Sequence, residues 1–578
     1  MFKLWKHLKP YTGMLLTAVI LIALQAIASL YLPDLNADII NNGVQKGDND
    51  YILQTGLLMM AVSVGSILCA IFSTYFAAKS AMSFGRDVRL HLFKKVQSFS
   101  KSDVDKFTPA SLITRNTNDV QQTQMFTFMM LTMMVSAPIT CIGGAIMAIR
   151  QDSKLAWVIA VLIPIMLIIV WLFASKALPL FKSMQSKIDG LNRLVREKLS
   201  GIRVIRAFVK ERTESARFDA ANKDLTNNNL KVARLMAIMM PMMTILININ
   251  CVAIVWFSGY RIDSGDMPVG NMTAFLSYSM QIMFSVIMAV MMFIMLPRAS
   301  VSAGRINEVL EAVPDIPDNA QGSRGFNRSE AKGLVEFKNV SFSYAGAEAP
   351  VLRNLSFAAK PGQTTAIIGS TGSGKSTLVN LIPRLYDVST GELLIDGINI
   401  KELNQADLHS LIGFVPQKAF LFKGTVASNL RYGKEDATEA EMWEAIETSQ
   451  SRDFIDDMPE GLNADIEQGG SNVSGGQRQR LSIARALIKK PPIYIFDDSF
   501  SALDFKTDAK LRAALAKNLS DVTIIIVAQR VSTVMNADNI VVLEDGVIAD
   551  MGTHEYLINN CSIYKEIVNS QQREEDLA

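Results

Sequence analysis

The residues whose types and spacing promise the most chemistry are Gly369–Thr377, which read Gly-Ser-Thr-Gly-Ser-Gly-Lys-Ser-Thr. They fit the pattern G-x-x-x-x-G-K-[ST], in which backbone N–H groups of a glycine-rich turn close around phosphates at a helix N-terminus. Lys375 can reach the outer phosphates of a nucleotide, and the Ser376 hydroxyl can bind Mg²⁺. Thr364–Ile368 before the loop predicts a buried strand, and Ser376–Leu385 after it predicts a helix. This context disfavours the plain alternative, a glycine-rich turn without a ligand.

Two further motifs place polar groups at the ends of predicted elements. The strand-like segment Gly413–Gln417 ends in a glutamine. The segment Asn472–Gln477 contains Ser-Gly-Gly-Gln and precedes Arg478–Lys490, which has a helical pattern. Ser474 can cap that helix, and the exposed N–H groups at its start form a second potential anion site.

Carboxylates and amides follow on two more predicted strands. Ile493–Asp498 is an apolar strand that ends in two adjacent aspartates, and Ser-Ala-Leu-Asp follows at 501–504. Thr523–Ala528 is another β-branched strand, and Gln529 stands directly after it. The sequence therefore predicts several strands whose ends carry groups able to bind phosphate and a hard cation.

The composition indicates a membrane protein. Of the 578 residues, 49% are hydrophobic and only 19% are charged, and the mean hydropathy is +0.22. The net charge of +2, which is 57 basic minus 55 acidic residues, argues against a nucleic-acid partner bound by bulk charge. Four widely spaced cysteines without a C-x-x-C pair indicate neither a disulfide framework nor a metal site.

Six apolar stretches are long enough to cross a bilayer. The first could be mistaken for a signal peptide, but its length and the stretches after it favour a membrane helix. Before it, Met1–Pro10 alternates lysines with apolar residues and predicts a short interfacial helix on the cytoplasmic face. The predicted spans are Tyr11–Leu32, Ile52–Ala78, Met125–Ile149, Leu155–Leu178, Leu235–Tyr260 and Asn271–Leu296.

The distribution of Lys and Arg predicts the orientation. The segments Lys79–Arg115 and Lys176–Arg234 are strongly basic, whereas the loops between the other spans are short and acidic or balanced. The basic loops and both termini are therefore expected on the cytoplasmic side. No proline stands between Pro179 and Pro241, and the apolar periodicity there predicts that the spans continue as helices rather than as a disordered loop.

The predicted spans are rich in methionine and poor in charge. Methionine surfaces repack easily, which suits promiscuous apolar ligands, although lipid-facing or packing roles are the plainer interpretation of any one residue. No Asp, Glu, Lys or Arg lies in the middle of a span, which argues against a proton-coupled relay. The polar candidates for ligand contact or for hydrogen bonds between helices are Gln25, Asn248, Asn250 and Gln281.

The order of the motifs resembles that of ABC transporter ATPase domains: P-loop, glutamine loop, Ser-Gly-Gly-Gln, Asp-terminated strand and Ser-Ala-Leu-Asp. The six spans with long cytoplasmic extensions are similar to one half of an ABC exporter, so the resemblance covers nearly the whole chain. It implies an all-α six-helix transmembrane domain at 1–310, a linker at 311–333 and an α/β P-loop (RecA-like) ATP-binding domain with a helical signature subdomain at 334–578. Phe107–Val120 and Phe208–Asn222 resemble the cytoplasmic loop tips that dock on ATPase domains.

The resemblance implies ATP and Mg²⁺ as cofactors. It assigns adenine stacking to Tyr344 and places Gln417 and Asp497 with Ser376 at Mg²⁺, Asp497 through water. Ser474–Gln477 would bind the γ-phosphate of a nucleotide held by the opposite subunit. The residues implied at a nucleotide are Tyr344, Gly369, Ser370, Thr371, Gly372, Ser373, Gly374, Lys375, Ser376, Thr377, Gln417, Ser474, Gly475, Gly476, Gln477 and Asp504.

Two positions depart from the family pattern. Asp498 stands where the family has the glutamate that polarises the attacking water, and its carboxylate is one methylene shorter. A displacement of about 1 Å at such a group can cost on the order of 10²-fold in rate. Gln529 replaces the family histidine; it can hydrogen-bond a phosphate but has no titratable ring. Tolerated drift in an active site is the alternative, which the intact binding residues disfavour.

These departures favour one half of a heterodimeric multi-pass exporter of the bacterial cytoplasmic membrane, resembling multidrug exporters with one weakened ATP site. This chain would supply the Walker residues of the weak site and, through Ser474–Gln477, the signature of the active site. The expected partners are a second homologous half-transporter, membrane lipid and small hydrophobic or amphipathic substrates, with no nucleic acid. A lipid or peptide exporter is one alternative, and an ATP-gated regulatory or channel-like membrane protein is another.

Overall fold

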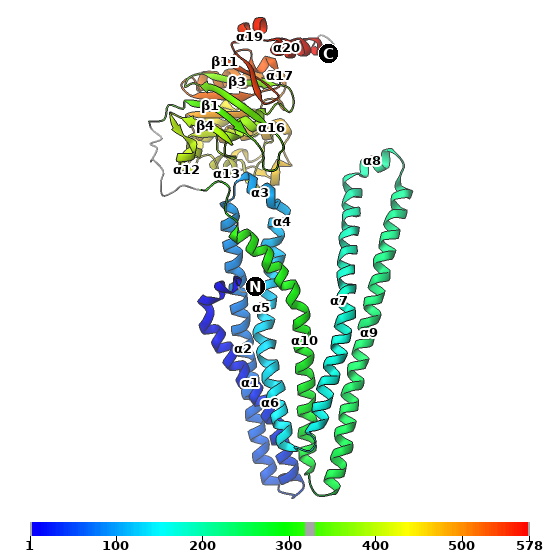
Figure 1. The fold of residues 1–578 in the computed structure, drawn as a ribbon. Helices are drawn as coiled ribbons and strands as arrows, with labels where there is room; N and C mark the ends of the chain where they lie inside the picture. The colour runs from blue at the N-terminus through cyan, green and yellow to red at the C-terminus, as the bar shows by residue number, and fades with distance from the viewer. Residues whose placement is uncertain (1–2, 318–329, 576–578) are drawn as a thin grey trace. The chain divides into compact units, whose positions relative to one another are not determined.

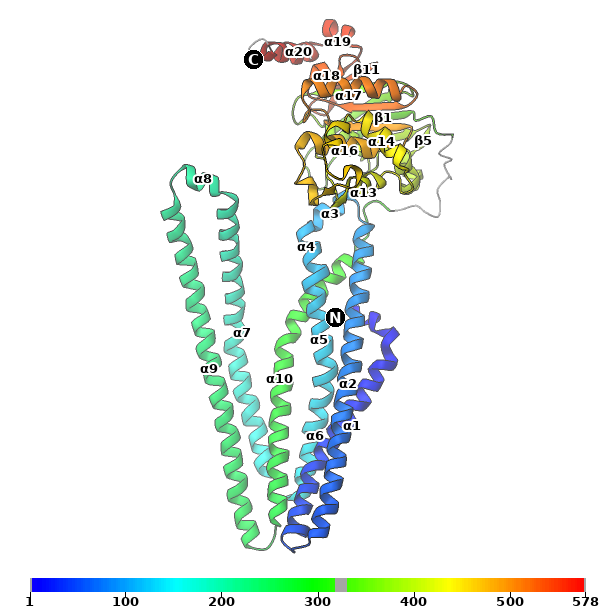
Figure 2. The same ribbon diagram turned by 180° about the vertical axis from the view of Figure 1, so that it is seen from behind.

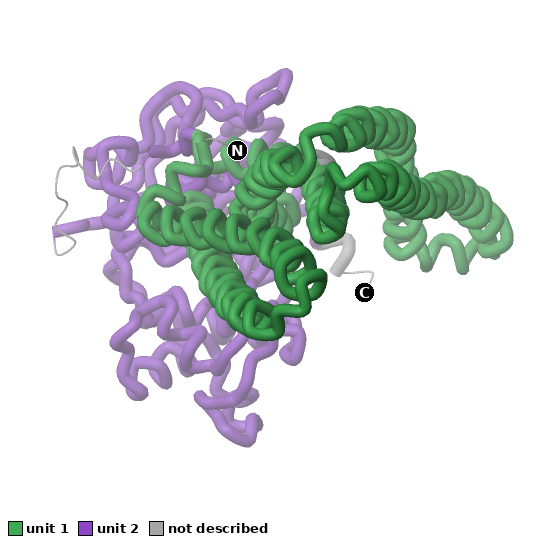
Figure 3. The backbone as a smooth tube through the Cα atoms, turned by 90° about the horizontal axis from the view of Figure 1, so that it is seen from below, with its two compact units in different colours: residues 1–97, 110–312 green, residues 98–109, 313–578 purple. Residues whose placement is uncertain are grey.

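Two compact units make up the chain. The computed structural model describes residues 3–317 and 330–575, so most of the linker expected at 311–333 lies outside the described residues. Residues 1–97 and 110–312 form the first unit, and residues 98–109 and 313–578 form the second (Figure 3). Residues 98–109 therefore group with the C-terminal unit, although they lie within the membrane domain expected from the sequence.

Six helical stretches of the first unit are apolar and long enough to cross a membrane, and they follow the order of the predicted spans. Several continue far beyond their apolar part: α2 has 49 residues, α7 has 45 and α9 has 53. The prediction that the spans continue as helices is thus confirmed. In Figures 1 and 2, α7 and α9 run side by side and α8 joins them at one end. The elements are η1 (Leu4–Tyr11), α1 (Thr12–Asp38), η2 (Ile39–Val44), α2 (Asn49–Gln97), α4 (Pro109–Thr114), η3 (Arg115–Asp119), α5 (Val120–Met129), η4 (Met130–Met134), α6 (Val135–Gln151), α7 (Ala156–Ser200), α8 (Ile202–Ala207), α9 (Glu211–Asp263) and α10 (Val269–Glu311).

Polar side chains join helices within the first unit. Asn250 on α9 is buried and donates to Ser279 Oγ on α10 at 2.6 Å, so this polar candidate makes a helix–helix hydrogen bond. Arg261 at the end of α9 pairs with Asp152, just before α7, at 2.6 Å. These contacts tie together the ends of α7, α9 and α10 that lie away from α8.

Two sheets form the framework of the second unit. The larger sheet has the order β12-β11-β3-β10-β9-β6, in which β11, β3, β10, β9 and β6 are parallel; the smaller antiparallel sheet has the order β2-β1-β4-β5. Their bounds are β1 (Val335–Phe342), β2 (Leu352–Ala359), β3 (Thr364–Gly369), β4 (Thr390–Ile395), β5 (Ile398–Asn399), β6 (Ile412–Val415), β9 (Ile493–Asp497), β10 (Thr523–Val527), β11 (Asn539–Glu544) and β12 (Val547–Gly552).

Helices and short strands surround these sheets (Figures 1 and 2). They are α11 (Lys375–Leu381), η6 (Ile400–Glu402), α12 (Gln405–Ser410), β7 (Gly424–Thr425), α13 (Val426–Arg431), α14 (Glu439–Thr448), α15 (Arg452–Asp456), η7 (Gly461–Asn463), β8 (Asp465–Ile466), η8 (Gln468–Gly470), α16 (Gly475–Leu487), α17 (Phe505–Asn518), α18 (Val531–Val534), α19 (His554–Asn560) and α20 (Ser562–Glu575).

The larger sheet is buried on both faces because its parallel strands are covered by other layers. Alternate residues of β3 enter two different hydrophobic cores: Ile367 packs with the core shared with the smaller sheet, and Ile368 packs with the helical core. This explains why the predicted strands read as continuous β-branched runs. The strands thereby hold the loops at their carboxyl ends on a rigid base.

Two helix boundaries differ from the sequence predictions. The helix after the P-loop ends at Leu381 rather than Leu385, because Pro383 lacks an N–H group and disfavours helical geometry in the residue before it. The helix after Ser-Gly-Gly-Gln begins at Gly475 rather than Arg478, since Ser474 caps its first turn.

The short helix α3 (Lys101–Phe107) belongs to the second unit and begins at a Ser100–Asp103 capping box. Ser102 donates to the Asp315 carboxylate at 2.7 Å, and the Tyr386 hydroxyl lies 3.5 Å from Asp105. Residues 98–109 thus group with the second unit and overlap the first expected loop tip, residues 107–120, only at 107–109. The second tip is α8, which ends at Ala207, just before the expected range 208–222. The capping box sets the start of α3, whereas α8 begins without a side-chain cap.

Candidate functional site

The glycine-rich loop between β3 and α11 has the geometry of a phosphate-binding turn. Gly369 ends β3, and a Cβ there would lie 2.0 Å from the carbonyl oxygen of Leu543 on the neighbouring strand. Gly374, directly before α11, has φ +98°, which side-chain-bearing residues rarely adopt. The loop thus leads into the N-terminus of α11, where unsatisfied N–H groups favour an anion.

Lys375 is folded back over this loop. Its Nζ donates to the carbonyl oxygens of Gly369 at 2.9 Å and Ser370 at 2.7 Å. Burial lowers the pKa of Lys375, while the charges of Asp498 and Asp497 act in the opposite direction. A phosphate can replace these carbonyl contacts with stronger charge-assisted hydrogen bonds.

The two groups best suited to Mg²⁺ lie in direct contact. Ser376 Oγ donates to Asp497 Oδ1 at 2.9 Å, across the ends of α11 and β9. Burial raises the pKa of Asp497 most, with a further contribution from the charge of Asp498, while the hydrogen bond from Ser376 and the charge of Lys375 act in the opposite direction. A hydroxyl and a carboxylate are the hard oxygen ligands that fit Mg²⁺, which usually takes its remaining ligands from phosphate and water. The residues present therefore fit the cation.

Asp498 lies at the centre of a small polar cluster. It is 7% exposed, and its φ of +47° is in the left-handed region. Gln417 Nε2 donates to Asp498 Oδ2 at 3.0 Å, and Gln529 Nε2 donates to the same oxygen at 2.8 Å. The two amide donors thus occupy both acceptor sites of Oδ2 on this carboxylate.

The parallel register explains why these residues meet. Asp497 on β9 lies opposite Val527 on β10, so the residues just after both strands emerge at one edge of the sheet. Gln417 follows β6, the next strand on the other side of β9. Gln529 and Gln417, which are 31 and 81 positions from Asp498 in sequence, thereby reach one oxygen of its carboxylate.

Tyr344 lies beside the phosphate-binding helix. Its hydroxyl and Thr377 Oγ1 are 3.0 Å apart, and its ring contacts Tyr386 edge-on with centroids 5.4 Å apart. The ring is 38% exposed, so one part remains open. The geometry is compatible with the adenine-stacking role predicted for this residue.

The Ser-Gly-Gly-Gln segment forms the N-terminus of α16. Ser474 Oγ accepts from the N–H of Gln477 at 3.2 Å, and the Gln477 side chain accepts from the N–H of Ser474 at 2.9 Å, which confirms the predicted cap. Asp504 plays the same capping role at α17 through the N–H of Thr507, and that hydrogen bond lowers its pKa. None of the hydrogen bonds found for these residues, in the described part of the chain, reaches Gly369–Thr377.

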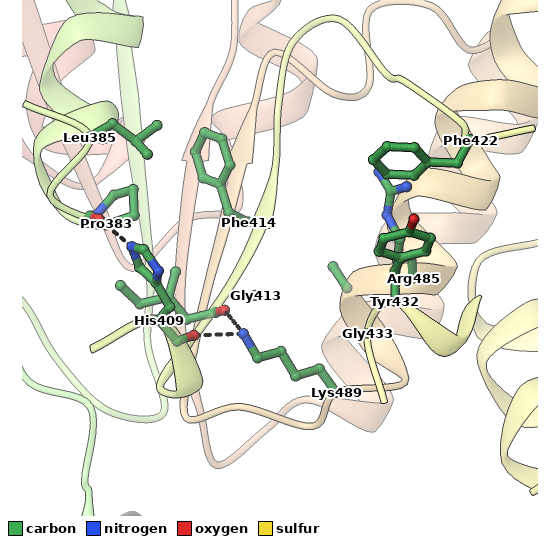
Figure 4. A pocket seen from close by; sticks show the side chains of 12 residues that line it. Pro383, Leu385, His409, Gly413, Phe414, Phe422, Tyr432, Gly433, Arg485 and Lys489 are labelled. Atoms are coloured by element: carbon green, nitrogen blue, oxygen red, sulfur yellow. Dashed lines mark hydrogen bonds between the residues drawn. The ribbon is translucent and has the colours of Figure 1, made fainter. Parts of the chain in front are cut away.

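Sequence reasoning missed a pocket of 370 Å³ on the second unit (Figure 4). Phe422 and Tyr432 stack with ring centroids 4.3 Å apart beside Arg485, and Phe414 and His409 lie across the pocket from them. Arg485 Nη1 is buried and has no hydrogen-bond partner among the described residues. No short motif predicts this pocket, because its lining comes from five separate segments.

The comparisons with known proteins agree with this architecture. The family model described as "ABC transporter transmembrane region" matches residues 15–286, and the one described as "ABC transporter" matches residues 352–501. The chain is 46% identical over 571 residues to an uncharacterized ABC transporter ATP-binding protein of Mycobacterium tuberculosis, covering 98% of this chain and 97% of that protein.

Two relatives carry more specific names. An ATP-dependent lipid A-core flippase of Syntrophus aciditrophicus is 33% identical, with 88% of this chain and 84% of the relative covered. A putative multidrug export ATP-binding/permease protein of Bacillus subtilis is 31% identical, with 98% of each covered. Among solved structures, a bacterial Atm1-family ABC exporter with ATP bound matches with a TM-score of 0.78 and 22% identity over 98% of each chain, which is a likeness of fold.

Proposed function

Since this chain belongs to the ABC transporter family and is an integral membrane protein with its exporter-type transmembrane region and ATPase domain in one polypeptide, we propose that it is one half of a heterodimeric multidrug exporter. The observation that carries this proposal is the double hydrogen bond on Asp498 from Gln417 and Gln529. A site that has no histidine, and whose short carboxylate has one oxygen occupied by two amides, binds ATP but hydrolyses it poorly. Efficient turnover then requires a second half that supplies the missing groups.

The exposed signature segment supports the same assembly. Ser474 and Gly475 are exposed at the N-terminus of α16, where free N–H groups attract an anion. In a head-to-tail pair, Ser474–Gln477 faces the nucleotide on the partner's Walker residues and completes the active site. This chain's own Walker residues and the partner's signature form the weak site, in which ATP acts mainly as a clamp.

A second surface points to a partner half. The segment after α8 exposes Phe208 by 70% and Val209 by 80%, beyond the apolar stretches that face lipid. The pocket beside Arg485 offers stacked aromatic rings and a buried guanidinium N–H without an acceptor. We propose that the partner's equivalent of α8 lies in this pocket, with a main-chain carbonyl at its C-terminal end accepting from Arg485, and that α8 occupies the corresponding pocket of the partner.

The membrane spans support an apolar cargo. Methionine-rich helices without charge at mid-span suit planar, amphipathic and often cationic compounds. The putative multidrug export relative favours this class, whereas the flippase relative favours a lipid, which remains the second candidate. In the proposed cycle, both termini and the ATPase domain are cytoplasmic, and ATP closes the two ATPase domains, which turns the cavity outward.

The experiment compares the purified chain alone with the chain co-purified with its partner half. We expect near-background ATPase activity alone, clear activity for the pair, and ATP-dependent accumulation of ethidium or Hoechst dye in inverted vesicles that contain the pair. A pair carrying Lys375→Ala in this chain controls for the nucleotide. Rapid ATP turnover by the chain alone contradicts the heterodimer, and transport of lipid or peptide without any dye contradicts the multidrug assignment.

A further inference from the structure

The last described helix, α20, contacts the segment that carries Gln529. Gln571 Nε2 donates to the main-chain oxygen of Gln529 at 2.7 Å, and Gln571 Oε1 accepts from the N–H of Val531 at 2.8 Å. Arg530 between them is extended, with φ −94° and ψ 132°, so both main-chain groups face the same side. One carboxamide thus satisfies two backbone groups, including the first N–H of α18.

The helix that carries Gln571 is anchored independently of these two hydrogen bonds. Tyr564 and Val568 are buried in the helical core, and the Tyr564 hydroxyl hydrogen-bonds His554 at 2.7 Å. Gln571 follows them by seven and three positions, on the same face of the helix. It is therefore held in place by packing rather than by its own contacts.

The contacted segment also directs a side chain into the nucleotide site. Gln529 donates to Asp498, which accepts from Gln417 as well. A continuous chain of hydrogen bonds runs from Gln571 through the main chain of 529–531 to the Gln529 amide and the Asp498 carboxylate. The position of the C-terminal helix thereby fixes where the Gln529 amide lies.

We propose that Gln571 is a positioning residue of the nucleotide site, through which the C-terminal helix sets the discrimination between ATP and ADP. This rests on the proposed function and on the expectation that Gln529, at the position of the family histidine, hydrogen-bonds the terminal phosphate of ATP. Without Gln571, two main-chain groups lose their partner and the 529–531 segment gains conformational freedom. Binding of ATP, which has a γ-phosphate for Gln529 to meet, then weakens, whereas binding of ADP does not change.

The test measures Mg²⁺-ATP and Mg²⁺-ADP affinities of the full-length chain in nanodiscs by competition with a fluorescently labelled ATP analogue. Gln571→Ala is expected to weaken ATP by about threefold to tenfold, the worth of one or two hydrogen bonds, and to leave ADP unchanged. Asn569→Ala is the matched control, because Asn569 is an exposed carboxamide on the same helix. It should change neither affinity.

A pair of truncations serves if Gln571→Ala lowers the yield of folded protein. A chain that ends at Gln571 keeps the contact, and a chain that ends at Ser570 lacks it. Only the shorter chain should therefore show weakened ATP affinity with unchanged ADP affinity. An unchanged ratio of ATP to ADP affinity in these variants, or an equal loss of both affinities, overturns the proposal. The readout is binding, so its result does not depend on the partner half or the cargo; failure of the unmodified chain to bind either nucleotide would instead refute the proposed function.

Discussion

The phosphate-binding side and the hydrolytic side of the nucleotide site lie at the same edge of the larger sheet but differ in what their side chains contact. On the first side, Lys375 donates to two carbonyls of its own loop, and Ser376 donates to Asp497. Nucleotide and Mg²⁺ can replace these contacts with stronger ones. On the second side, Asp498 is engaged by two amides, from Gln417 and Gln529. We therefore expect that the two strand-end residues Asp498 and Gln529 affect hydrolysis far more than nucleotide binding.

The largest expected effect comes from restoring the family residues on the hydrolytic side. Replacing Asp498→Glu together with Gln529→His restores a longer carboxylate and a titratable ring, so ATPase activity of the chain alone should rise on the order of 10²-fold. Each single replacement should raise the ATPase rate much less, because it leaves either the Gln529 amide or the short Asp498 carboxylate in place. Steady-state ATPase rates at saturating ATP measure this gain. An unchanged rate in the double variant would contradict the proposal that these two residues limit hydrolysis.

Removing the charge on the phosphate-binding side should abolish most binding. Lys375→Ala should weaken ATP by about 10- to 100-fold, because it removes charge-assisted hydrogen bonds to phosphate. Lys360→Ala, an exposed lysine in the turn before β3, is the control and should have no effect. Equilibrium binding of a fluorescent ATP analogue measures both, and unaltered affinity in the first variant would remove Lys375 from the site.

A smaller loss is expected from the exposed signature. Ser474→Ala removes a hydroxyl proposed to serve the partner's γ-phosphate and should slow ATP turnover by the pair by roughly tenfold. Ser471→Ala, another exposed serine just before the signature, is the control. ATP affinity at this chain's own P-loop should not change. A loss of that affinity in Ser474→Ala would indicate that Ser474 contacts the nucleotide on this chain's own P-loop and not the partner's nucleotide.

Acidification should weaken the Mg²⁺ contribution by a few fold. Burial raises the pKa of Asp497, so this group takes up its proton at a higher pH than an ordinary aspartate. Only the ionised carboxylate supports the cation, and Mg²⁺-dependent tightening of ATP binding should therefore decline as pH falls. Affinities with and without Mg²⁺ from neutral to mildly acidic pH measure this decline. Asp497→Asn should remove the share of the Mg²⁺-dependent tightening that depends on this carboxylate rather than on ATP alone. Identical pH profiles of the variant and the unmodified chain would contradict the assignment of Asp497 to Mg²⁺.

The smallest effect should come from Asp498. Asp498→Asn should change ATPase activity of the pair by less than about twofold, since that carboxylate does little in turnover. The Glu→Gln replacement at the aligned position of the partner half should nearly abolish activity. If both replacements are equally damaging, both sites hydrolyse ATP and the asymmetric mechanism is wrong.

Local patterns predicted most of the elements that carry the site. The β-branched run before the P-loop formed β3, the periodic basic loops formed the long helices α7 and α9, and Ser474 capped α16. Each of these depends on side chains within a few residues of one another, which is why sequence sufficed. Boundaries differed from the prediction where a proline follows the end of an element, as at Pro383, or where a capping residue begins one, as at Ser100.

The convergence of distant residues could not be obtained in this way. That Gln417 and Gln529 share one oxygen of Asp498 depends on the order β10-β9-β6 and on its register, and that Gln571 reaches Gln529 depends on how α20 packs. The sequence by itself determined the family, the six membrane helices and the candidate residues for ATP binding, because motif spacing and hydropathy are local properties of the chain. Only the tertiary structure decided which groups surround Asp498, because burial and strand order, rather than sequence proximity, select the partners of a buried carboxylate.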